Sequence, residues 1–108
     1  MADFTSKSWD GSASKYKDTN AFCAACLIDL NPDGQDKTQA NCKLPVKEPD
    51  GTVNTNAVHA ASAALAGARG GLKGVSAADK KKAAKTLCNY YAQMKEDAPD
   101  SLKQIAGA

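Results

Sequence analysis

The sequence predicts a mainly α-helical domain with a minor β contribution. It has two principal helices packed as a pair, a short N-terminal helix, and an irregular or short two-stranded β element around residues 42–54. Three observations predict this class. The chain has 108 residues, enough for one hydrophobic core. Apolar residues recur at helical spacing in two stretches of the second half. The stretch that lies between the short N-terminal helix and the first principal helix has prolines and glycines at turn positions. These residues interrupt helical periodicity.

The first principal helix is predicted to begin at Asn54 or Asn56, either of which can cap it, and to end near Arg69. Its buried stripe is formed by Val58, Ala61, Leu65 and Ala68. The alanines that flank this stripe permit close helix packing. Gly70-Gly71 follows and can adopt the left-handed conformation that ends a helix.

The second principal helix is predicted over about residues 76–96, because Ser76-Ala-Ala-Asp79 resembles a capping box. Its buried stripe comprises Ala84, Leu87, Cys88, Tyr91 and Met94. Pro99 ends this region. A last helical turn is predicted from Ser101, with the side chains of Leu102 and Ile105 pointing toward the core.

The N-terminal half is predicted to be less regular. Residues 1–8 are small and polar and predict a flexible tail ahead of a single domain over residues 9–106. Asp18 or Thr19 can cap a short helix to about Cys26, after which residues 26–30 fit either the helix end or a strand. Pro45 limits any strand over residues 42–46 to a sheet edge. The Pro49-Asp50-Gly51 sequence predicts a tight turn.

Composition restricts the class of protein. Of the 46 hydrophobic residues, 21 are alanine and 4 are cysteine, so only 21 large apolar side chains remain for the core. No apolar run reaches 18 residues, so we expect no membrane-spanning segment and no membrane partner. Polar residues follow Met1-Ala-Asp-Phe, which does not fit a secretory signal. We therefore expect a reducing compartment, in which a disulfide framework is disfavoured.

The four cysteines are candidate zinc ligands: Cys23, Cys26, Cys42 and Cys88, with His59 as an alternative fourth ligand. The spacing between Cys23 and Cys26 fits a zinc knuckle, but Ala24-Ala25 offers no turn residue between them. A redox dithiol and simple packing of buried thiols are the alternatives, and packing is favoured because free cysteine behaves as a small hydrophobic residue. We expect no cofactor other than this candidate zinc ion.

Lysines predominate among the basic residues. The chain has 14 basic and 12 acidic residues, and only Arg69 is an arginine, so a dedicated nucleic-acid reader is disfavoured. The local concentration of charge is Lys80, Lys81, Lys82 and Lys85, which on a helix lie opposite the apolar stripe. A solvated helix face is the favoured interpretation, and nucleic-acid binding is the alternative.

The sequence shows no arrangement of residues that predicts an active site. His59 is the single histidine, and we expect it to be satisfied within the first helical turns, oriented by Asp50 and Asn54. The carboxylates are scattered, and the glycines of residues 67–74 follow a helix rather than opening one, as a phosphate-binding loop would. We therefore predict that the protein is not an enzyme.

Four segments together resemble a small module of tailed-phage head-morphogenesis genes, found beside or fused to prohead serine proteases and in short phage structural proteins. They are Trp9-Asp-Gly-Ser-Ala-Ser14, Cys26-Leu-Ile-Asp-Leu30, Cys42-Lys-Leu-Pro-Val-Lys-Glu-Pro-Asp-Gly-Thr-Val-Asn54 leading into Val58-His59-Ala-Ala, and Lys85 to Leu102. The resemblance covers about residues 9–102, and the third segment is its most specific part. Cys26 and Cys42 stand where the module often has cysteine.

The resemblance implies a role in virion assembly and no proteolysis, since the chain has no protease domain. The expected function is that of a capsid decoration (cement) protein or head-assembly module, present in the virion and in the host cytoplasm during assembly. The expected partner is the phage major capsid protein or another head protein, with self-association as an alternative. The residues expected to organise the helices, or to form the contact patch where exposed, are Trp9, Leu44, Pro45 and Val46.

Overall fold

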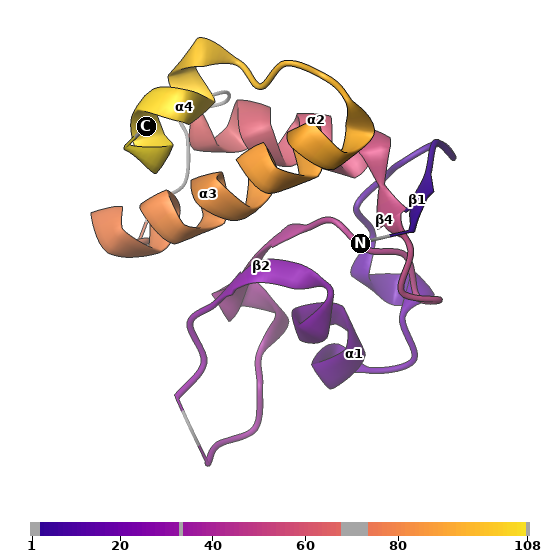
Figure 1. Ribbon diagram of the computed structural model, residues 1–108. Coiled ribbons are helices and arrows are strands. Elements are labelled where there is room, and N and C mark those ends of the chain that lie inside the picture. Colours follow the sequence, from indigo (N-terminus) through magenta and orange to yellow (C-terminus); the bar gives the residue numbers. More distant parts are fainter. Residues whose placement is uncertain (1–2, 33, 68–73, 108) are drawn as a thin grey trace.

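The structure is a computed structural model that describes residues 3–32, 34–67 and 74–107. The elements are β1 (Phe4–Thr5), the 3-10 helix η1 (Ala13–Lys15), α1 (Thr19–Ala24), β2 (Cys26–Asp29), the 3-10 helix η2 (Gln39–Asn41), β3 (Cys42–Pro45), β4 (Val53–Asn54), α2 (Thr55–Leu65), α3 (Ala77–Met94) and α4 (Asp100–Ala106). The last three helices pack together, and α1 with the β2–β3 hairpin forms a smaller unit against them (Figure 1). The predicted mainly α class with minor β structure is confirmed.

Helix α2 begins where the sequence predicts. The Asn54 side chain caps it, because its Oδ1 accepts hydrogen bonds from the backbone N–H groups of Asn56 (2.9 Å) and Ala57 (3.1 Å). The helix ends at Leu65, earlier than predicted, and Gly67 then has a positive φ of 106°. The predicted stripe residues Val58, Ala61 and Leu65 are buried. Ala68, Arg69 and Gly70-Gly71 lie outside the described residues.

Helix α3 also begins as predicted, because Ser76 Oγ accepts a hydrogen bond from the Asp79 N–H at 3.1 Å. Its predicted stripe faces the core: Ala84, Leu87 and Tyr91 are buried, and Cys88 and Met94 are half-buried. The helix packs against both α2 and α4. In α4, Leu102 is fully buried and Ile105 is half-buried, as expected. None of the described helices combines the length and apolar content needed to cross a membrane.

The β structure extends beyond the predicted element around residues 42–54. Strand β3 pairs in antiparallel orientation with β2, with Ile28 opposite Lys43, so residues 26–29 are a strand and not a helix end. Strand β4 pairs in parallel with β1. Residues 42–54 therefore contribute to two separate sheets. Within this stretch the two arms are also linked directly, by the antiparallel Lys47–Val53 bridge and by the Asn54 N–H, which donates to the carbonyl of Val46 at 2.8 Å.

The predicted turn at residues 48–52 connects these arms. The Gly51 N–H donates to the carbonyl of Glu48 at 2.8 Å, and the Glu48 N–H donates to the carbonyl of Thr52 at 2.7 Å. Gly51 has φ of +92°, the left-handed conformation that closes a three-residue hairpin loop. This confirms the turn that Pro49-Asp50-Gly51 predicts.

The prediction of a flexible tail over residues 1–8 is wrong for its described part. Phe4 and Thr5 form β1, and the carbonyl of Asp3 accepts a hydrogen bond from the Val53 N–H at 2.8 Å. The Phe4 ring packs edge-on against Tyr90, with centroids 6.0 Å apart. The short pairing of β1 with β4 is made by backbone groups. Such pairing needs no periodic pattern of apolar residues, so the polar sequence of this segment does not indicate it.

Candidate functional site

A shallow groove of about 270 Å³ brings together most of the residues that were expected to form a contact patch. It is lined by Trp9, Gly11, Leu44, Pro45, Ala57, Ala60, Ala61 and Ala64. Three segments far apart in the sequence contribute: the turn after β1, strand β3 and one face of α2. Apart from Gly11, the lining residues have apolar side chains, and four of them are small alanines of α2.

The expected binding residues differ in their exposure. Trp9 and Pro45 are half-buried, so both retain accessible surface. Leu44 is 7% exposed and Val46 is fully buried. Val46 is therefore a core residue, and it has no exposed surface with which to contact a partner. Leu44 has φ of 61°, an uncommon conformation for a residue with a Cβ, and its side chain packs into the main core.

The orientation of Trp9 is set by a chain of polar contacts that ends at α2. Lys15 Nζ lies 3.8 Å from the centroid of the Trp9 ring and 3.2 Å from Glu48 Oε1. The other carboxylate oxygen of Glu48 accepts a hydrogen bond from Asn54 Nδ2 at 2.8 Å. Asn54 is fully buried and caps α2, so one connected network fixes the Trp9 side of the groove relative to the helix on its other side.

The cysteines do not form the predicted four-cysteine zinc site. Cys23 in α1 and Cys42 at the start of β3 form a disulfide, with their Cα atoms 5.3 Å apart. Cys26 and Cys88 are free and half-buried. Cys88 packs against the main core, whereas the other three cysteines belong to the small cluster around Tyr16 and Phe22.

The expectation that a disulfide is disfavoured is therefore corrected. It rested on the compartment alone, and a spacing of 19 residues does not indicate whether two cysteines meet in space. The β2–β3 pairing brings the start of β3 back beside α1, within the range of Cα separation that a disulfide requires.

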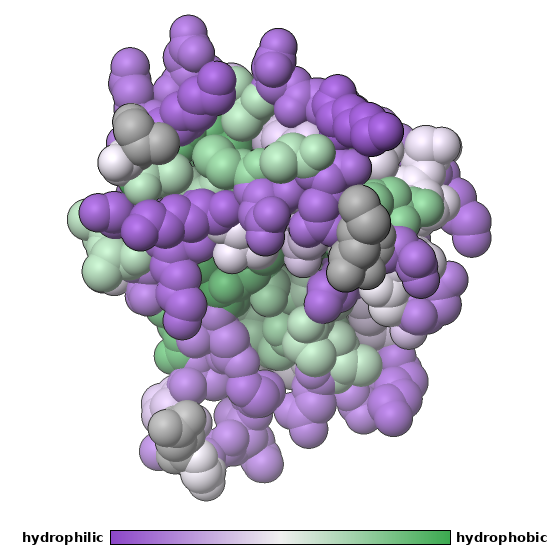
Figure 2. Space-filling view, in the orientation of Figure 1, coloured by the Kyte–Doolittle hydropathy of each residue, from purple (hydrophilic) through white to green (hydrophobic). Residues whose placement is uncertain are grey.

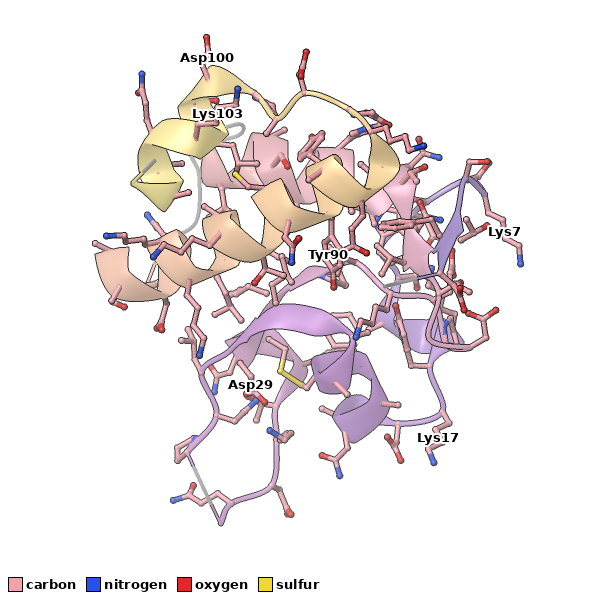
Figure 3. The ribbon with its side chains drawn as sticks, in the orientation of Figure 1. Lys7, Lys17, Asp29, Tyr90, Asp100 and Lys103 are labelled. Carbon is pink, nitrogen blue, oxygen red and sulfur yellow. A yellow bond between two sulfur atoms is a disulfide. The ribbon has the colours of Figure 1, made fainter. Side chains whose placement is uncertain are left out.

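A carboxylate lies beside this disulfide (Figure 3). The Sγ atoms of Cys23 and Cys42 and a carboxylate oxygen of Asp29 lie within 4.8 Å of one another, and Cys26 and Cys88 are outside this group. Asp29 pairs with Lys37, and that hydrogen bond, with those from the Asn31 backbone and side chain, lowers the pKa of Asp29 to about 2. Burial raises the pKa of the nearby Cys26 thiol to about 12.

The lysines of α3 remain apart from acidic groups. Lys81, Lys82 and Lys85 are exposed and Lys80 is half-buried, and within the described part of the chain none of the four has an ion pair. Figure 2 shows polar side chains along α3 between two areas of apolar surface, one toward α4 and one over the β2–α1 region. The lysines thus form a solvated helix face.

His59 has a different partner from the one expected. Its Nε2 lies 2.9 Å from Glu96 Oε1, just after the end of α3, and its ring lies 5.8 Å from that of Tyr91. Asp50 and Asn54 make their hydrogen bonds elsewhere. The imidazole is 45% exposed and links two helices at the surface.

A second depression of about 500 Å³ lies between α1 and the 48–51 turn. It is lined by Tyr16, Lys17, Ala21, Ala24, Ala25, Lys47, Glu48, Pro49 and Gly51. Tyr16 donates its hydroxyl hydrogen to the carbonyl of Lys47, and burial, followed by the charge of Glu48, raises the pKa of Tyr16 to about 12. The hydroxyl is thus engaged in holding the turn and is a poor acid or base at neutral pH.

No protein-family model matches the chain, and no curated protein or solved structure matches it significantly.

Proposed function

We propose that this protein is a non-enzymatic docking module of the phage head, a capsid decoration or head-assembly protein that binds a larger head protein through the Trp9 groove. The observation that carries the proposal is the convergence of Trp9, Leu44 and Pro45 with the alanine face of α2 on one apolar depression. It acts in the virion and, during assembly, in the host cytoplasm.

The phage context comes from the resemblance, whose first and third segments supply most of the groove lining. The Trp9-Asp-Gly-Ser segment provides the ring and Gly11, and the long segment from Cys42 provides Leu44 and Pro45. The Val58-His59-Ala-Ala stretch of α2 provides two of the alanines. A module whose distinguishing residues meet on one surface is suited to recognition at that surface.

The chemistry of the groove favours a protein partner. Its walls offer aromatic and aliphatic contact, and aromatic residues such as tryptophan contribute much of the binding energy at protein interfaces. The network from Lys15 to Asn54 holds Trp9 in place before binding, which reduces the ordering cost of association.

The test compares two alanines of α2 that are both exposed. Ala60 lines the groove and Ala63 does not. Ala60→Glu places a charged side chain in the groove, whereas Ala63→Glu is the matched control. Neighbouring genes identify the head proteins to use, and binding to those proteins and to assembled capsids is measured by co-sedimentation and calorimetry.

We expect the wild-type protein to bind at micromolar concentration or tighter. Ala60→Glu should weaken binding at least tenfold and Ala63→Glu less than twofold, with both variants melting like the wild type. Failure of the wild type to associate with any head protein, or an equal loss in the control, contradicts the proposal.

A second candidate function is nucleic-acid binding by the exposed lysine face of α3. The observation in its favour is that Lys81, Lys82 and Lys85 have no ion pair among the described residues. Such binding would weaken steeply as salt concentration rises, because phosphate contacts release counterions. A DNA mobility shift that is lost between about 50 and 200 mM salt, and lost in a Lys81→Ala, Lys85→Ala double variant, would favour it over docking.

A further inference from the structure

Three donor atoms of the kinds that bind zinc converge at the end of the β2–β3 hairpin. They are the sulfurs of Cys23 and Cys42 and a carboxylate oxygen of Asp29, all within 4.8 Å of one another. Cys23 is 3% and Cys42 is 6% exposed, whereas Asp29 lies at the surface at the end of β2. A pair of buried sulfurs beside an accessible carboxylate is an incomplete tetrahedral ligand set.

These donors are held together by contacts other than the disulfide. Asn31 Nδ2 donates to Asp29 Oδ1 at 2.8 Å and lies 3.2 Å from the Cys42 sulfur. Asn31 Oδ1 accepts hydrogen bonds from the Thr38 N–H at 2.8 Å and from Asn41 Nδ2 at 3.3 Å. Asn31 Nδ2 also lies 3.9 Å from the Cys23 sulfur, so the Asn31 side chain contacts all three donor residues. Opening of the sulfur–sulfur bond therefore leaves the three donors near one another.

We propose that this cluster is a redox-gated zinc site: the oxidised chain holds the Cys23–Cys42 disulfide, and the reduced chain binds Zn²⁺ through both sulfurs and Asp29. A dithiol reductant gives two electrons and two protons to the disulfide, yielding two protein thiols and the oxidised cyclic reductant. Zn²⁺ then replaces the two thiol protons, which pass to solvent, and a water molecule completes the four-coordinate set.

The arrangement accommodates the ion with side-chain motion alone. Two sulfurs bound to one tetrahedral zinc at about 2.3 Å each lie about 3.8 Å apart. The Cα atoms of Cys23 and Cys42 are 5.3 Å apart, so rotation about their Cα–Cβ bonds reaches that separation. Asp29 must leave Lys37, and since both side chains of this ion pair are about one-third exposed, water replaces the lost contact.

The ligand chemistry selects the ion and excludes the other thiols. Two thiolates favour zinc over calcium or magnesium, which prefer oxygen ligands. The Cys26 sulfur donates to the carbonyl of Phe22 at 3.3 Å and is not within the donor group. Cys88 packs against the main core. Both are therefore matched control thiols in the same chain.

The test uses the full chain reduced with a phosphine, desalted without oxygen and titrated with Co²⁺ as a spectroscopic probe. Zn²⁺ affinity is then measured by competition with a chromogenic chelator. We expect thiolate-to-cobalt absorption at one ion per reduced chain and none in the oxidised chain. Asp29→Asn, a surface change, should weaken Zn²⁺ binding at least tenfold while the disulfide still forms.

The cysteine variants give the specific controls. Cys23→Ser should abolish the cobalt absorption, whereas Cys26→Ser and Cys88→Ser should change zinc affinity less than twofold. The proposal is overturned by a reduced wild-type chain without thiolate-to-cobalt absorption, whether folded or unfolded by circular dichroism. It is equally overturned by Asp29→Asn binding like the wild type, or by Cys26→Ser losing as much affinity as Cys23→Ser.

Discussion

Replacement of Asn54 should destabilise the protein more than any other single polar substitution near the groove. Asn54 is fully buried, and each atom of its amide has two partners. Its Oδ1 accepts hydrogen bonds from two N–H groups of the first turn of α2. Its Nδ2 donates to the carbonyl of Lys7 at 3.0 Å and to Glu48 Oε2 at 2.8 Å. One side chain thus joins the N-terminal segment, the 48–52 turn and the helix.

The magnitude follows from these contacts. Loss of an N-cap costs about 1 kcal/mol. Loss of a hydrogen bond to a carboxylate costs about 2 kcal/mol, because the partly buried Glu48 carboxylate keeps Lys15 on one oxygen and loses the Asn54 donor on the other. Asn54→Ala is therefore expected to reduce the free energy of unfolding by about 3 kcal/mol. Asn54→Ser keeps an oxygen that can cap α2, so its expected loss is about 2 kcal/mol.

The assay is urea unfolding followed by circular dichroism, with the slope m compared between variants. Asn56→Ala is the control, since Asn56 also donates to the carbonyls of Ser6 and Lys7 but is exposed. Its expected loss is about 0.5 kcal/mol. A loss of less than about 0.5 kcal/mol for Asn54→Ala, at unchanged m, would refute the reasoning that this amide joins the three segments.

The remaining predictions concern the core, the free thiols and acid stability. Leu87→Ala, at a fully buried position of α3, should reduce the free energy of unfolding by about 3 kcal/mol in the same urea assay, and a near-neutral effect would show that the α3 face is misassigned. Alkylation at pH 8 with mass spectrometry should label Cys88 before Cys26, because a pKa of about 12 leaves almost no Cys26 thiolate; faster labelling of Cys26 contradicts this burial effect. The pKa of Asp29 is lowered from 3.8 to about 2, so its contribution to stability is present above about pH 4 and is lost as pH falls toward 2. Urea midpoints at pH 5 and pH 2.5 should therefore differ less in Asp29→Asn than in the wild type, and equal differences contradict the contribution of the Lys37 ion pair.

The helical half of the fold could be predicted because its signals are local. The Ser76 cap, the stripe through Leu87 and Tyr91, and the Asn54 cap each depend on residues within a few positions of one another. Helix α2 ended earlier than expected, since Gly67 already has the positive φ that stops a helix. The end of a helix depends on which of several glycines stops it, and the periodicity of apolar residues does not determine which glycine that is.

The rest depends on contacts between distant segments. The pairing of β1 with β4 joins residues about 50 positions apart through backbone groups alone. The Cys23–Cys42 bond and the contact between His59 and Glu96 likewise require the tertiary arrangement. The expected contact residues Trp9 and Pro45 meet at the groove, but Val46 is buried. The alternation of side chains in a short extended segment shows which residues share a face. It does not show which of the two faces is buried.

The docking of Phe4 on Tyr90 affects when the chain can finish folding during synthesis. The two residues are 86 positions apart, and translation proceeds at about 5–20 residues per second. About 4–17 s therefore pass between the synthesis of Phe4 and that of Tyr90. Until then β1 can pair with β4, but the Phe4 ring lacks its aromatic partner. The Phe4–Tyr90 contact is therefore among the last contacts of the N-terminal segment to form, and changes at Phe4 should slow this final packing more than they alter the helical core.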